Sequence, residues 1–446
     1  MCQTIHLFTQ LTIHTVQAGH AVQIQMNLPP ELITLIIDNL SNCLNSLKHC
    51  SLVCRVWTTY TRRHLLRSIS FRLSSSISKH EARTRSQDFI LFVTRMTYTP
   101  GLIGCVERFT LDVSPTTIDH DFLYQIVNPI VSSLPFRELR FLEVHWNRFM
   151  DENGHLTALI ARSPLLETLL LDGPLISNED ELEAFLGLRS PNIRTLCLHN
   201  VNMTRVFTIR EGTSLFLSAF ASKLASKLEG SVAVPQLRKL SLCPIGTEII
   251  HKCILNPAMR MYEPTHLRLA SNHINHDLLR DFALSFQSIT SLTLELGSFN
   301  SLGTNNSLFP NLIRLQVMGV KSAHTLISVL SETTTVTRAP RLQRIHLHLR
   351  HVHPPTPLPS LDDSVIKSVL DPYLYSLLLP RQQRVTLTIE VSTSYEPRAN
   401  SWVAKGKPKR VFSRTSSLPN VTIRMKATER WWGKARDDEN EARPLL

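Results

Sequence analysis

A pattern of large apolar residues with the spacing L-x-x-L-x-L recurs along most of the chain beyond residue 100. Its copies begin at Val106, Leu139, Leu166, Ile193, Leu237, Ile289, Leu312 and Leu342, with a weaker copy at Pro264. Successive copies are mostly about 23 to 33 residues apart, which is typical of an array of similar strand-containing units. In five copies a proline stands just before the pattern, as in SPNIRTLCL, where it can end the preceding element without removing a ladder hydrogen bond. Each copy therefore predicts one strand with a marked start.

Segments with helical spacing lie between these strands. They are Phe122–Leu134, Leu156–Ile160, Leu182–Leu188, Ile249–Ile254, Leu278–Phe286 and Leu326–Leu330. In the one wide interval, an apolar helical face runs from Leu217 to Leu228, so we expect a longer helix there and no break in the array. The alternation predicts an α/β fold in which stacked units form a solenoid with one strand face open. This part of the chain resembles an irregular leucine-rich-repeat domain.

The segment LPPELITLIIDNL, residues 28–40, predicts a short amphipathic helix. Two prolines stand where a first helical turn tolerates them. Apolar residues then follow at i, i+4 and i+8: Leu32, Ile36 and Leu40. Two further short helices are expected, one through Leu47 and one through Trp57. A unit this small buries little apolar surface and usually needs a partner or a neighbouring domain for stability.

This segment closely resembles an F-box, from Leu28 to Phe71. The resemblance is carried by Leu28, Pro29, Glu31, Leu32, Ile36, Leu40, Leu47, Ser51, Val53, Cys54, Arg55 and Trp57. The family implies docking on the Skp-type adaptor of an SCF-type cullin-RING ubiquitin ligase. The adaptor-binding residues would be Leu28, Pro29, Leu32, Ile36, Leu40, Leu47, Val53, Cys54 and Trp57. One departure is the stretch Ser41–Ser46, which lacks the acidic residue often found there. The alternative is an ordinary amphipathic helical hairpin.

An F-box followed by such an array resembles F-box proteins that carry leucine-rich repeats. The resemblance implies a substrate-recognition subunit that binds the adaptor through the F-box and a target protein through the repeats. Such a subunit positions its target and performs no bond chemistry, so we expect neither catalysis nor a cofactor. A rival from another class is a repeat scaffold without a ligase role, which binds nucleic acid through a basic tail.

The chain is expected to have five regions. They are a flexible extension over 1–26, the F-box over 27–72, a linker helix region over 73–100, the repeat domain over 101–393 and a basic tail over 394–446. The extension lacks the basic start and continuous apolar run of a signal peptide, and translation starting at Met26 is a hypothesis. No run of 18 apolar residues predicts a membrane span. Eight cysteines without a CxxC pair fit reduced thiols and a cytoplasmic or nuclear location.

The formal net charge is +12, and residues 394–446 carry 12 Lys/Arg against 6 Asp/Glu, half of that excess. Within this region the run KGKPKR, Lys405–Arg410, is a candidate nuclear localisation signal or nucleic-acid contact. Short basic runs of this kind are common in flexible loops, which is the simpler interpretation. We therefore do not favour nucleic acid as the partner.

The charge of the open strand face changes along the array. Alternating strand positions through residue 172 carry one Arg against three acidic residues, whereas those from residue 239 onward carry four Lys/Arg against one acidic residue. We therefore predict that Lys239, Arg268, Arg314 and Arg344 bind an acidic or phosphorylated segment of a target protein. The alternative is a solvated face whose polarity arose by chance.

Motifs that would indicate chemistry are few. The run HLHLRHVH places His346 and His348 on one face of a strand, but no Cys or carboxylate nearby in sequence completes a metal site. Cys50 and Cys54 fit small buried hydrophobic residues better than a redox pair. No GxSxG or HExxH motif and no Gly-rich phosphate loop occurs.

Overall fold

The computed structural model describes residues 29–41, 43–52, 55–73, 77–99, 101–113, 120–150, 154–176, 181, 184–186, 190, 192–200, 202–203, 237–243, 263–271, 276–296, 309–320, 323–333, 339–351, 366–393 and 412–428. The chain divides into two compact units, Met1–Arg67 and Ser68–Leu446. Each unit is described separately below.

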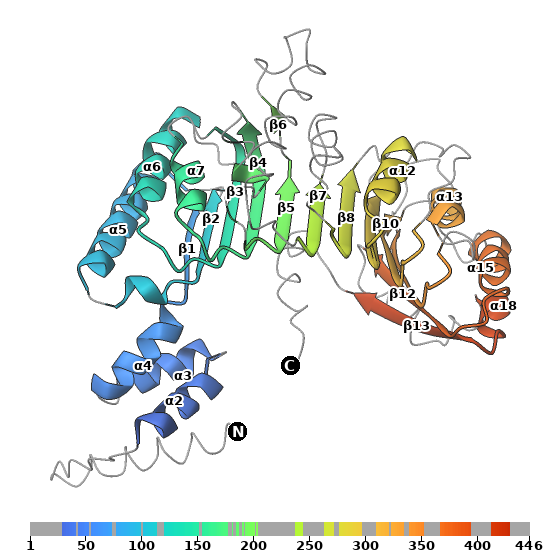
Figure 1. The fold of residues 1–446 in the computed structure, drawn as a ribbon, viewed down its shortest axis with the longest axis horizontal. Coiled ribbons are helices and arrows are strands. Elements are labelled where there is room, and N and C mark those ends of the chain that lie inside the picture. Colours follow the sequence, from blue (N-terminus) through green and yellow to red (C-terminus); the bar gives the residue numbers. More distant parts are fainter. Residues whose placement is uncertain are drawn as a thin grey trace, which may run out of the picture. The chain divides into compact units, whose positions relative to one another are not determined.

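The described part of the first unit is helical (Figure 1). Its helices are α2 (Pro30–Asn39), α3 (Leu44–Ser51) and α4 (Arg55–Leu65). Pro30 occupies the first turn of α2, where its missing N–H costs no intrahelical hydrogen bond. The core contains the fully buried Ile33, Ile37 and Leu47. Side chains packed against it are Leu40, Trp57, Tyr60 and Leu65.

The second unit is an α/β array built on one parallel sheet, solenoid-like in part. The strands are β1 (Ser68–Leu73), β2 (Arg108–Val113), β3 (Phe141–Met150), β4 (Thr168–Ile176), β5 (Thr195–His199), β6 (Asn202–Met203), β7 (Lys239–Cys243), β8 (His266–Ser271), β9 (Ser291–Leu296), β10 (Arg314–Val320), β11 (Arg344–His351), β12 (Val385–Thr393) and β13 (Val421–Thr428). Twelve of them lie side by side in chain order, and β6 pairs with β4 (Figure 1). Along these twelve strands every neighbouring pair is parallel, so successive units follow one another in one direction along the sheet.

Helices alternate with the strands and cover one face of the sheet. They are α5 (Lys79–Tyr98), α6 (His120–Ser133), α7 (His155–Ala161), α12 (His276–Ser285), α13 (Ala323–Thr333), α15 (Asp371–Leu378) and α18 (Ser413–Ser416), with short helical turns at Ile103–Cys105 and Ile366–Leu370. Phe89 of α5 contacts Phe71 and Phe109, with ring centroids 5.2 and 6.2 Å apart. Phe71 and Phe109 are among the alternating residues of β1 and β2 that are buried, so the core lies between the sheet and the helices.

The predicted copies are equivalent in the structure. In all nine, the strand begins two residues after the first position of the pattern, as in Val106 and Arg108. The carbonyl just before one strand accepts two backbone N–H groups from the next unit. The carbonyl oxygen of Arg194, for example, accepts from Arg238 at 2.7 Å and from Lys239 at 2.9 Å. This bond joins units across the widest sequence interval, where β5 pairs directly with β7 as expected.

The array extends further at both ends than the predicted limits. Ser68 begins β1, which pairs with β2, so residues 68–72 belong to the sheet and not to the helical unit. Helix α5 packs against β1 through Phe89 and Phe71 and is the first helix of the array, in the region predicted to be a linker helix. At the other end, β12 lies within the predicted repeat domain, and β13 pairs with it in parallel, so the sheet continues to Thr428 within the predicted tail. The predicted helix over 182–188 lies largely outside the described residues, and those over 217–228 and 249–254 lie outside them entirely.

Candidate functional site

The helical unit exposes an apolar surface. On α2, Ile33 and Ile37 face the core, while Leu32 and Leu35 are 46% and 58% exposed. Leu52, just after α3, is 81% exposed, and Val56 on α4 is 51% exposed. Exposed large apolar side chains on a small unit are positions that another molecule can cover.

The nine residues predicted to bind the adaptor have different environments. Leu32 and Pro29 are exposed and Ile36 is half-buried, whereas Leu40 and Trp57 pack against the core. Leu47 is only 1% exposed and belongs to the core of the unit, so it does not lie on the free surface. The predicted contacts Leu28, Val53 and Cys54 lie outside the described residues.

Three exposed apolar residues were absent from that prediction: Leu35, Leu52 and Val56. Leu35 is three residues after Leu32, which places both on one helical side and was readable from spacing. Leu52 and Val56 flank the end of α3 and the start of α4, where exposure depends on how the helices pack.

The sheet face opposite the helices carries three parallel rows of side chains, defined by the strand register. The first row contains Arg108, Phe141, Thr168, Thr195, Lys239, His266, Ser291, Arg314, Arg344 and Thr386. The second row begins with Thr110 and Glu143 and includes Arg268 and His346. The third row includes His145, Asp172, Glu295 and Glu390. All four residues predicted to bind substrate lie on this face.

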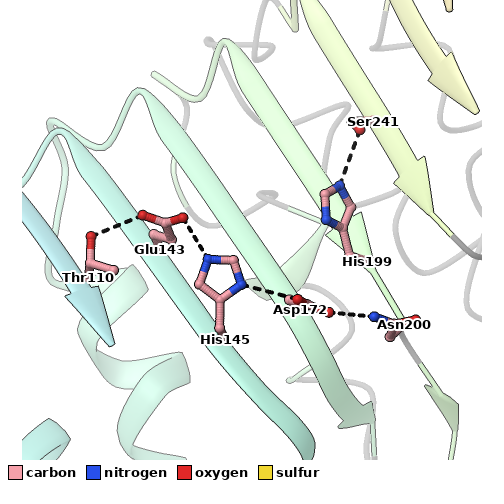
Figure 2. Close-up of polar contacts among 7 residues, drawn as sticks. All are labelled: Thr110, Glu143, His145, Asp172, His199, Asn200 and Ser241. Carbon is pink, nitrogen blue, oxygen red and sulfur yellow. Dashed lines mark hydrogen bonds and ion pairs between the residues drawn. The ribbon is translucent and has the colours of Figure 1, made fainter. Parts of the chain in front are cut away.

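A hydrogen-bonded network occupies the face over β2 to β5 (Figure 2). The His145 ring lies between two carboxylates, with Nε2 2.6 Å from Glu143 Oε1 and Nδ1 3.1 Å from Asp172 Oδ2. The Thr110 hydroxyl donates to Glu143 at 3.0 Å, and the Asn200 amide donates to Asp172 at 2.6 Å. A carboxylate only accepts, so a ring that binds two of them donates from both nitrogens.

The two carboxylates of this network have lowered pKa values. Burial raises the pKa of Glu143, but the hydrogen bond and charge of His145 and the Thr110 hydroxyl outweigh it. Burial likewise raises the pKa of Asp172, and hydrogen bonds from His145 and Asn200 outweigh it, lowering the pKa to about 2. Both groups are therefore ionised and already bonded, so this half of the face satisfies its own charges.

Over β8 to β12, the second and third rows also pair internally. Arg268 Nη2 lies 3.1 Å from Glu295 Oε2, across one strand boundary. His346 Nε2 lies 3.0 Å from Glu390 Oε2, a carboxylate supplied by β12. The predicted ligand Arg268 is therefore already paired with a carboxylate.

The first row differs from the other two at β10 and β11, where its two arginines have no carboxylate partner among the described residues. Arg314 and Arg344 stand directly opposite each other on β10 and β11, and both are exposed. Neither forms a hydrogen bond or ion pair from its side chain to any residue that the structure describes. Ser291 and Thr386 flank them in the same row. Partial burial and the charges of Arg314 and Lys239 lower the pKa of His266 in this row.

Of the histidines in the run HLHLRHVH, His346 lies beside the carboxylate of Glu390. Among the described residues, no group of three or more His, Cys, Asp or Glu side chains is arranged to hold a metal ion. His353, Cys54 and the run Lys405–Arg410 lie outside that part of the chain. Cys50 is half-buried, and burial raises the pKa of its thiol. Within the described ranges, no helix has both the length and the apolar character needed to cross a bilayer.

None of the protein-family models matches the chain, and no curated protein matches it significantly.

Proposed function

We propose that this protein is the substrate-recognition subunit of an SCF-type cullin-RING ubiquitin ligase. The exposed leucine pair on α2, Leu32 and Leu35, carries the proposal, because a small helical unit with an uncovered apolar side fits docking on the Skp-type adaptor. The F-box-like residues of the segment support the same assignment. The open strand face then binds the target protein, through its basic part over β7 to β11.

The function of such a subunit is positional. Binding adaptor and target in one chain raises the effective concentration of a target lysine beside the ubiquitin-conjugating enzyme. The structure supports two separate binding surfaces, one on each compact unit. No residue of this chain needs to take part in bond chemistry.

Titration of the full chain with a purified Skp-type adaptor tests the proposal. The variant Leu32→Asp/Leu35→Asp should weaken adaptor binding at least about 100-fold, because each leucine that the adaptor covers contributes about 1.5 to 3 kcal/mol to binding. These residues lie outside the core formed by Ile33, Ile37 and Leu47, so the helices should still fold.

Leu284→Asp is the matched control, since Leu284 on α12 is 64% exposed and lies in the other unit. It should leave adaptor affinity unchanged. Absence of adaptor binding by the native chain, or unchanged binding by the double variant, would contradict the ligase assignment. Salt-sensitive binding of nucleic acid without adaptor binding would instead support the scaffold alternative.

A further inference from the structure

We propose that Ser291, Arg314, Arg344 and Thr386 form a binding site for a phosphate monoester, carried by a phosphorylated Ser or Thr of the target protein. The inference that the phosphate comes from a target rests on the proposed function. Phosphate binding itself rests on the strand face alone.

The four side chains come from four consecutive strands in one register. Arg314 on β10 is opposite Ser291 on β9 and Arg344 on β11, and Arg344 is opposite Thr386 on β12. Neighbouring strands are about 4.8 Å apart, so the two guanidinium groups can reach the same anion from either side. The hydroxyl groups lie at the two ends of the set. The row therefore presents hydrogen-bond donors over four strands.

No carboxylate within the described part of the chain competes for these arginines. Glu295 and Glu390 are the acidic side chains of the neighbouring strands, and both lie in the third row. Glu295 is 3.1 Å from Arg268 and Glu390 is 3.0 Å from His346. Both carboxylates are thus engaged within the second and third rows, and the positive charge of Arg314 and Arg344 lies on the first row.

Arg314 and Arg344 repel each other, and a bound anion would make their arrangement favourable. Like charges directly opposite each other on neighbouring strands destabilise a sheet, and a bound anion converts that repulsion into attraction. A guanidinium group is a planar fork that matches phosphate oxygens with two parallel hydrogen bonds. A phosphate monoester has three terminal oxygens and can accept from both forks, whereas a carboxylate has only two. This difference favours phosphate over an Asp or Glu side chain.

Calorimetric titration of the full chain with inorganic phosphate, at constant ionic strength set by chloride, tests the site. The native chain should bind phosphate with saturation, and phosphate should raise the midpoint of thermal unfolding. Arg314→Gln and Arg344→Gln should each weaken binding at least about tenfold, as expected for losing charge-assisted hydrogen bonds. Arg344→Lys keeps the charge but loses the fork, so its affinity should lie between those of the native chain and Arg344→Gln.

A control removes the same charge elsewhere. Arg341 is exposed and bonds Asn311 Oδ1 at 3.1 Å, before the strand begins. Arg341→Gln should retain phosphate binding within about twofold. Equal weakening by all three Gln variants would show a nonspecific charge effect and overturn the site.

Stability measurements separate binding from folding defects. In phosphate-free buffer, Arg344→Gln should raise the unfolding midpoint because it removes the repulsion from Arg314. The same variant should lose the increase that phosphate produces in the native chain. A variant that is less stable in both buffers would indicate a structural role for Arg344 and contradict the inference.

The source of the phosphate is tested with phosphoserine blocked at both termini. Affinity equal to or above that of inorganic phosphate supports a phosphorylated target, whereas binding of inorganic phosphate alone overturns that part. Absence of adaptor binding by the native chain would contradict the ligase assignment but leave these phosphate results unchanged, so the two proposals fail separately.

Discussion

The two halves of the open strand face differ in how their charged side chains are paired. Over β2 to β5, polar side chains form a closed network in which His145 joins Glu143 and Asp172. Over β9 to β12, the first row places Arg314 beside Arg344 without a carboxylate between them. One half satisfies its charges internally, and the other keeps charge available to a ligand. Whether a charged side chain on this face is structural or available to a ligand therefore depends on its pairing across strands, and not on the number of charged residues.

Removing His145 should have the largest effect on stability. His145→Ala would leave Glu143 and Asp172 as partly buried carboxylates without their common partner, and breaking such a pair costs about 3 kcal/mol. Urea unfolding of the second unit measures this loss. His266→Ala, in the basic half, should change stability by less than about 0.5 kcal/mol. Equal losses of stability in the two variants would contradict the view that only the acidic half depends on internal pairing.

Asp172 should give the acidic network a pH signature. Its pKa is about 2 in the folded chain against an ordinary value of 3.8 for an aspartate, so its stabilisation is present above about pH 4 and is lost as the pH falls toward 2. The contribution is on the order of 2 kcal/mol. Asp172→Asn should be less stable at neutral pH and less sensitive to acid in this range. Asp88→Asn, at an exposed position of α5, should retain the native acid profile.

His266 should make anion binding by the basic half mildly dependent on pH. Its Nδ1 is 2.9 Å from the Thr265 hydroxyl, and partial burial, Arg314 and Lys239 lower its pKa. A bound anion offsets those positive charges and favours the protonated ring. Sulfate keeps its charge over the titration, so its affinity should rise a few fold between about pH 7.5 and 5.5. His266→Gln should bind sulfate with an affinity independent of pH in this window.

The strands of the array show which of them the L-x-x-L-x-L pattern predicts and which it misses. The nine predicted copies each contain a strand that begins two residues after the first position of the pattern. In β12 and β13 the register puts Arg384 and Asn420 at that first position, which hid Leu387, Ile389, Ile423 and Met425 from the pattern. In β1 the full pattern is present as Leu66, Ile69 and Phe71, but it directly follows the helical segment and overlaps the F-box-like residues.

The helical unit shows the same limit at single residues. Helical spacing predicted that one side of α2 is apolar, but Leu32, Ile33, Leu35, Ile36 and Ile37 are all apolar. Only the packing of α3 and α4 decides that Ile33 and Ile37 are buried while Leu32 and Leu35 are exposed. It also decides that Leu47 is a core residue. Spacing defines the angular separation of side chains, whereas burial depends on where neighbouring helices lie.

The amino-acid sequence by itself determined the local order of the molecule: short N-terminal helices, a parallel array of strand-helix units and the alternation that puts Lys239, Arg268, Arg314 and Arg344 on one face. These features depend on periods of a few residues, which hydrophobic burial enforces locally. Only the tertiary structure decided that Arg268 is paired with Glu295 while Arg314 and Arg344 remain available. Those contacts join residues separated by a whole repeat, so they depend on the lateral register of stacked strands, which no local period specifies.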